Sequence, residues 1–148
     1  MNYLIPDNKE IHKAVRDKVD RENWYNDVYR ISKYALGETM NRIMTFPYSK
    51  KITLDFVVSR MKRIRDLIGQ KRISVFSIED IKGEWQKHLT ELKNRDSFVE
   101  IDDIFILSFF CADPEANAFY TTDTHIIDSK GINDYMKRNE KKIEEISI

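Results

Sequence analysis

Residues 103–123, DIFILSFFCADPEANAFYTTD, decide how this chain of 148 residues folds. An acid opens an apolar run that is hydrophobic on every side, so a helix formed there must be buried all round. Asp113 and Pro114 then favour a turn. Residues 118–121 are typical of a short strand, and Asp123 comes just after it. The stretch therefore predicts a buried helix, a turn and a strand, with one acid before the helix and one after the strand.

The rest of the chain also alternates short apolar runs with helical spacing of apolar residues. Such alternation predicts a mainly parallel sheet covered by helices on both faces, which is an α/β fold. Residues 1–148 fit a single domain of this kind, because a chain of this length can bury a sizeable core. We expect strands over 2–6, 28–31, 73–78, 118–121 and 142–148, and helices over 8–20, 32–46, 53–69, 79–93, 104–112 and 131–139.

Composition excludes several classes of protein. Hydrophobic residues make up 41% and charged residues 34%, with four glycines and three prolines, which excludes collagen-like and wholly disordered chains. No apolar run approaches the roughly 20 residues needed to cross a bilayer, and Met1–Asp7 does not resemble a secretory signal. The single cysteine, Cys111, excludes a disulfide framework and Cys-based zinc binding. We expect a cytoplasmic protein with no membrane partner.

The formal net charge is zero, but the charges are unevenly distributed. Residues 49–72 carry eight basic side chains against two acids, and residues 96–129 carry eight acids without a Lys or Arg. The basic residues are Lys50, Lys51, Arg60, Lys62, Arg63, Arg65, Lys71 and Arg72. The acids are Asp96, Glu100, Asp102, Asp103, Asp113, Glu115, Asp123 and Asp128.

This distribution has two interpretations. Carboxylates that converge repel one another unless a cation joins them, and a basic stretch in the same domain could hold a polyanion that also meets that cation. Alternatively, both stretches are ordinary solvated faces.

Three acids have positions suited to a metal site. In parallel sheets the working site lies beyond the carboxyl ends of the strands, where Asp7 and Asp123 follow predicted strands. Asp103, at the start of the buried helix, can point toward the same edge and gains from the helix dipole. Converging carboxylates suit Mg²⁺ or Mn²⁺, either of which can activate a water for attack on a phosphodiester. Each acid could instead be only a helix cap or a turn residue.

The chain resembles the PIN domains, which are metal-dependent ribonucleases with a three-layer, Rossmann-like fold. The best-matching stretch consists of residues 103–107, the apolar helix that follows and FYTTD at 119–123. Two further segments resemble the family, namely LIPD at 4–7 and VYRISKYALGE at 28–38. It implies that Asp7, Asp103 and Asp123 ligate Mg²⁺ or Mn²⁺, that Glu38 ligates metal or positions the attacking water, and that Thr121 is a supporting hydroxyl. The chain would then be an endoribonuclease.

The basic stretch offers residues that could steer an RNA backbone toward such a site, namely Arg60, Arg63, Lys71 and Arg72. The family also implies a role as the toxin of a toxin–antitoxin pair, with an antitoxin as protein partner, or a role in RNA processing. Homodimers are common in it.

The sequence departs from the family at Asn8 and Lys9, where Thr or Ser and then Asn or Ser usually follow the first acid. A lysine at the site would compete electrostatically with the metal. This feature favours a second function, a catalytically inactive PIN-like module that binds RNA or protein. A third alternative is a purely structural interaction protein whose acids are scattered over the surface.

Overall fold

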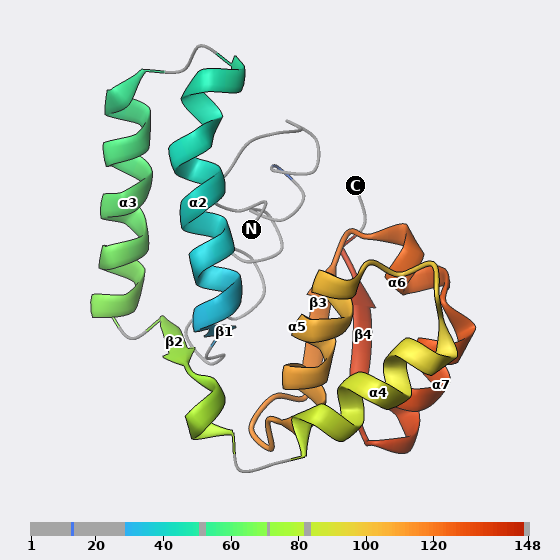
Figure 1. The fold of residues 1–148 in the computed structure, drawn as a ribbon. Helices are drawn as coiled ribbons and strands as arrows, with labels where there is room; N and C mark the ends of the chain where they lie inside the picture. Colours follow the sequence, from blue (N-terminus) through green and yellow to red (C-terminus); the bar gives the residue numbers. More distant parts are fainter. Residues whose placement is uncertain (1–12, 14–28, 51–52, 71, 82–83, 147–148) are drawn as a thin grey trace. The chain divides into compact units, whose positions relative to one another are not determined.

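The computed structural model describes residue 13 and residues 29–50, 53–70, 72–81 and 84–146 (Figure 1). The strand predicted over 2–6 and the helix predicted over 8–20 fall outside these residues, apart from Lys13, which is helical. Asp7, Lys9 and Lys71 also lie outside them. The chain divides into two compact units, one extending to Phe76 and one from Ser77 to Ser147.

The first unit contains a pair of parallel strands and two helices. Ser32 closes β1, and its Oγ accepts a hydrogen bond from the Ala35 backbone N–H at 3.1 Å, which caps the first turn of α2 as predicted. The two strands are in register from Tyr29 opposite Ile73 to Ser32 opposite Phe76. The elements are β1 (Tyr29–Ser32), α2 (Lys33–Lys50), α3 (Leu54–Gly69) and β2 (Ile73–Phe76).

The core of the first unit lies between its two helices. Ile43 on α2 and Ile64 and Leu67 on α3 are buried together. Because α3 carries its apolar residues at helical spacing, one side of the helix enters this core and the other carries charged side chains.

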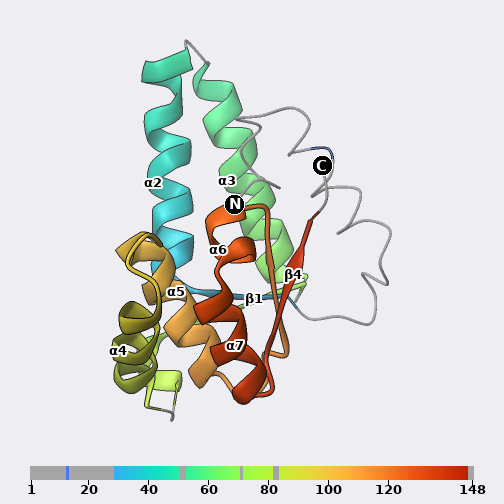
Figure 2. The ribbon, with the colours of Figure 1, turned by 90° about the vertical axis from the view of Figure 1, so that its right-hand side faces the viewer.

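The second unit contains residues 103–123, the stretch predicted to form a buried helix, a turn and a strand. Its strands form a second parallel pair, with Ala118 opposite Lys142 and Thr121 opposite Glu145. Figures 1 and 2 show α4 beside α5 and α7 beside β4. The elements are a 3₁₀ turn (Ile78–Asp80), α4 (Trp85–Arg95), α5 (Ile101–Ala112), β3 (Ala118–Thr121), α6 (Thr124–Asp128), α7 (Lys130–Arg138) and β4 (Lys142–Glu145).

Helix α5 is the centre of the second unit. Its apolar residues pack against Leu92 on α4 and against Ile132 and Met136 on α7. The prediction that this segment is a helix buried on all sides is confirmed from Leu107 onward, where every residue to Ala112 is buried. The helix begins at Ile101, two residues before the predicted acid, so Asp103 lies inside its first turn.

A buried lysine joins the turn before β3 to the start of β4. Lys141 Nζ donates hydrogen bonds to the Asp113 backbone oxygen at 2.6 Å and to the Ala116 backbone oxygen. It also lies 5.4 Å from the centre of the Phe110 ring. Burial lowers the pKa of Lys141, but its contacts with backbone oxygens compensate the desolvated ammonium group. This lysine therefore fixes both connections that lead into the second strand pair.

The α/β class and the parallel pairing are confirmed, and β3 has the predicted bounds. Several details are wrong. Pro47 does not end α2, and the strand predicted over 73–78 ends at Phe76, because Ser77 and Asp80 form a capping box around a separate 3₁₀ turn before α4 begins at Trp85. In addition, α5 begins at Ile101, β4 ends at Glu145, and α6 was not predicted. The described strands form two pairs, so a single central sheet and a single domain stay predictions.

No helix in the described part of the chain is both long enough and apolar enough to cross a membrane.

Gly131 provides a test of how closely α7 packs on the end of α4. A Cβ at this position would lie 2.7 Å from the Arg95 backbone oxygen, so we expect Gly131→Ala to lower the free energy of unfolding by about 1–3 kcal/mol. Gly37 on α2 is the matched control, because an added Cβ there meets nothing within 4 Å. Gly37→Ala should raise the free energy of unfolding by about 0.5–1 kcal/mol. Urea denaturation of both variants measures the difference, and equal effects would contradict the packing described.

Candidate functional site

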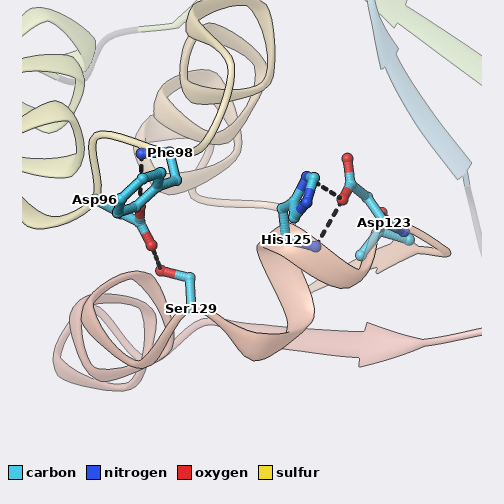
Figure 3. A network of polar contacts seen from close by, with 6 residues as sticks. Asp96, Phe98, Asp123, His125 and Ser129 are labelled. Atoms are coloured by element: carbon cyan, nitrogen blue, oxygen red, sulfur yellow. Dashed lines mark hydrogen bonds and ion pairs between the residues drawn. The ribbon is translucent and has the colours of Figure 1, made fainter.

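Asp123 is held in a defined turn at the end of β3. Its backbone N–H donates to Thr121 Oγ1 at 3.0 Å, and its Oδ1 accepts from the His125 backbone N–H at 2.8 Å, which makes it the N-cap of α6 (Figure 3). No described residue makes a hydrogen bond or ion pair with Asp123 Oδ2. Asp123 is thus both a helix cap and a partly exposed carboxylate with one oxygen open to a cation or water.

The exposed imidazole of His125 lies beside this carboxylate. Its Nδ1 is 3.8 Å from Asp123 Oδ1, so a protonated ring would form an ion pair with the acid (Figure 3). Thr121 and Asp123 are the predicted site residues that the structure brings together, and His125 lies beside them.

Asp103 lies in the first turn of α5 and is half-buried, whereas its neighbour Asp102 is exposed. The N-cap of this helix is Glu100. The alternative that Asp103 is merely the helix cap is therefore wrong. It lies in the first turn of a 12-residue helix, near the positive end of the helix dipole.

Glu38, the fourth predicted acid, belongs to the first unit. It lies on α2 and forms an ion pair with Arg42 Nη2 at 3.1 Å, one helical turn further on. Pairs at this spacing contribute only about 0.3–0.5 kcal/mol, so the contact leaves Glu38 able to exchange partners.

The predicted RNA-contacting residues differ in their surroundings. Arg60 lies on α3 with its guanidinium 4.8 Å from the centre of the Phe56 ring, where the aromatic face partly compensates the charge. Arg63 on the same helix is exposed, and Arg72 is half-buried before β2. Lys71 lies outside the described residues.

Among the described residues, no group of three or more His, Cys, Asp or Glu side chains is arranged to hold a metal ion. Asp7, the first of the four predicted ligands, lies outside that search. The four-carboxylate metal site therefore stays a prediction.

A polar contact that no sequence pattern predicted joins Asp96, at the end of α4, to Ser129. Asp96 Oδ2 accepts from Ser129 Oγ at 2.5 Å, and Oδ1 accepts from the Phe98 backbone N–H at 2.9 Å (Figure 3). Ser129 also caps α7, because its Oγ accepts from the Ile132 backbone N–H. An Asp after a helix indicates the local turn, but its partner is 33 residues away and no local pattern predicts it.

These hydrogen bonds lower the pKa of Asp96, with the Ser129 hydroxyl as the largest cause and the Phe98 N–H next.

Cys111 is not a candidate nucleophile. It is buried on α5 next to the Met136 sulfur, and burial raises its pKa to about 12. The thiol therefore stays protonated at neutral pH, and the residue is a small apolar part of the core.

In comparisons with family models, curated proteins and solved structures, nothing matched this chain.

The pKa of Asp96 tests the contact with Ser129. Ser129→Ala removes the strongest hydrogen bond to the carboxylate, so we expect the pKa of Asp96 to rise toward its ordinary value. A carboxylate with a lowered pKa contributes stability above the pKa of the unfolded chain, and that contribution is lost as the pH falls through the folded pKa. Below about pH 4, the free energy of unfolding should therefore fall less steeply with pH in Ser129→Ala than in the unaltered chain.

NMR titration of the Asp96 carboxyl carbon measures this pKa. Thr90→Ala, which removes an exposed hydroxyl on α4, is the control and should leave the Asp96 titration unchanged. An Asp96 titration that is the same in Ser129→Ala and in the unaltered chain would contradict the assignment.

Proposed function

We propose that this chain is a metal-dependent endoribonuclease of the PIN type, with a three-layer Rossmann-like fold, that hydrolyses phosphodiester bonds in single-stranded or looped RNA. In this proposal Asp7, Asp103 and Asp123 hold Mg²⁺ or Mn²⁺, and Glu38 ligates the ion or positions the attacking water. Thr121 supports the turn that carries Asp123.

The strand pairing supports the proposed fold. In a doubly wound sheet of order 3-2-1-4-5, strand two pairs with strand three and strand four with strand five. If the strand predicted over residues 2–6 is the first, β1 and β2 become strands two and three, and β3 and β4 become strands four and five. Both described pairs are then the ones that this order requires, and both are parallel.

The turn at the end of β3 is the observation that carries the proposed site. A Thr-x-Asp segment follows a parallel strand there, and the threonine hydroxyl fixes the backbone of the acid. Because Oδ1 is occupied by the cap and Oδ2 has no described partner, Asp123 offers one carboxylate oxygen to a ligand. Strand ends of this kind are where parallel sheets place their functional groups.

The proposed chemistry assigns a distinct task to each group. A divalent ion held by these acids would lower the pKa of a water and would neutralise charge on the phosphodiester. Asp103 and Asp123 contribute negative charge from α5 and from the end of β3. Glu38 would ligate the ion or accept a hydrogen bond from the attacking water and so orient it. Arg60, Arg63, Lys71 and Arg72 attract the RNA backbone, and their contribution should weaken as salt increases.

The second candidate is a PIN-like module that binds RNA or protein without cleaving. The residue that favours it is Lys9, whose ammonium group beside the first acid would compete with a metal ion. In either case a cellular role as a toxin neutralised by an antitoxin, or in RNA processing, rests on the family resemblance alone.

Cleavage of mixed single-stranded RNA oligonucleotides in the presence of Mn²⁺ tests the proposal. Asp103→Asn and Asp123→Asn should each lower the rate by roughly 100-fold or more, because the charge stabilisation supplied by a bound divalent ion amounts to several kcal/mol. Chelation of the metal should have the same effect. Asp102→Asn is the matched control, because it removes the exposed neighbouring acid and should leave cleavage intact.

Cleavage that persists in Asp103→Asn would identify a contaminating nuclease and contradict the proposal. Saturable RNA binding without cleavage, combined with a gain of cleavage in Lys9→Ser, would instead support the binding module.

A further inference from the structure

A histidine on α4 contacts a tyrosine on α7, and these two helices lie side by side (Figure 1). His88 Nδ1 is 2.9 Å from the Tyr135 hydroxyl oxygen, and the two rings meet edge to face with their centres 5.9 Å apart. Tyr135 is 7% exposed and belongs to the core, whereas His88 is half-buried. We call His88 and Tyr135 the His–Tyr pair.

The hydrogen bond of the pair suits a neutral imidazole. The tautomer with its proton on Nε2 leaves Nδ1 able to accept from the Tyr135 hydroxyl. Burial raises the pKa of Tyr135, so this hydroxyl keeps the proton that it donates. An imidazolium carries a proton on both nitrogens, so the hydroxyl would have to accept instead. No other described residue makes a hydrogen bond with that hydroxyl, so its own proton would then lose its partner.

The surroundings of His88 also oppose a positive ring. Burial is the largest cause that lowers the pKa of His88, and the charge of Lys87 acts in the same direction. Glu84 acts the other way, but it is exposed and pairs with Lys87 at 3.4 Å. Lys141, the residue before β4, lowers the pKa further. A proton on His88 would therefore add a charge to a partly desolvated contact that already has cations nearby.

The other groups around the pair do not compensate such a charge. On α5 the start of α4 meets an apolar side chain, because Trp85 packs on Phe109 with ring centres 5.3 Å apart. The guanidinium of Arg95 lies 4.8 Å from the centre of the tyrosine ring and pairs with Glu91 at 3.5 Å. The two acids that act on the pair, Glu84 and Glu91, are thus exposed and each already paired with a cation.

Helix α7 is the element that depends most on this contact. It has nine residues, which are too few for a helix to be stable by itself in water. Met136, the residue after the tyrosine, has its sulfur 3.3 Å from the Cys111 sulfur in the core. A loss of packing between α7 and α4 would therefore expose Cys111, which is buried while α7 is in place.

We propose that the His–Tyr pair is a pH-sensitive latch that holds α7 against α4 while His88 is neutral and loosens when His88 takes up a proton. Histidine is the side chain that ordinarily changes charge between about pH 5 and pH 8, so the latch would respond to mild acid. The pKa of His88 is lowered in the folded chain. The latch therefore contributes stability above the pKa of histidine in the unfolded chain, and this contribution is lost as the pH falls through the lower, folded value.

The reactivity of Cys111 tests this proposal, because it is the single cysteine of the chain. Its labelling by a pyridyl disulfide is measured between about pH 7.5 and about pH 5, in the folded and in the urea-unfolded chain. The ratio of the two rates gives the equilibrium constant for opening and removes the effect of pH on the thiol itself. Carboxylates with ordinary pKa values near 4 stay largely ionised over this range.

We expect the equilibrium constant for opening to rise as the pH falls. The rise should approach the ratio of the acid dissociation constants of His88 in the folded and the unfolded chain, which NMR titration of the ring measures. His88→Gln replaces the imidazole by an amide that does not titrate and can still accept from the tyrosine, so the rise should be lost. Tyr135→Phe should raise the constant at about pH 7.5 by roughly 2- to 10-fold, the effect of one lost hydrogen bond.

His125→Gln is the matched control. It removes an exposed histidine that follows β3, and it should leave the rise at low pH intact. Circular dichroism verifies that each variant is folded. Three results would overturn the proposal: an opening constant that does not change with pH, a rise that persists in His88→Gln, or a pKa of His88 that is no lower in the folded chain than in the unfolded one. None of these results depends on nuclease activity.

Discussion

The burial of α5 is the constraint on which the rest of the second unit depends. The helix has no polar side to turn toward water, so α4, α7 and the neighbouring strand pair must cover it. Fully burying each large apolar side chain contributes about 1.5–3 kcal/mol, so the buried residues of this helix stabilise the second unit substantially. The first turn of α5 lies at the edge of the core and carries Asp103. The residues that follow the other end of the helix lead into β3.

Polar contacts hold the turns and helix ends of the second unit that the apolar core does not fix. Lys141 joins the turn after α5 to the start of β4, and Thr121 fixes the backbone of Asp123. Asp96 and Ser129 join the end of α4 to the start of α7. These contacts hold the strand end that carries a candidate ligand and the turn that exposes Phe98, so stability and surface chemistry depend on the same few hydrogen bonds.

The sequence was most informative where local physics decides the structure. The apolar run over 104–112 predicted a buried helix, and the residues of 118–121 predicted a strand with the observed bounds. Helix starts were less predictable: Asp103 was expected at the beginning of α5, but Glu100 occupies the N-cap. The Asp96–Ser129 contact and the buried Lys141 were not predicted, because each joins residues that are distant in sequence and depends on how the helices pack. Of the predicted site, the structure shows the hydrogen bond between Thr121 and the Asp123 backbone, and the convergence of all four acids stays a prediction.

The proposed function requires that acids distant in sequence converge on one divalent cation. Paramagnetic broadening of backbone amide resonances during Mn²⁺ titration tests this convergence directly, because the effect falls steeply with distance from the ion. We expect saturable broadening centred on residues 7, 38, 103 and 123, and its loss in Asp103→Asn. Broadening scattered along the acids of 96–129 without saturation, or saturable broadening unchanged in Asp103→Asn, would contradict it.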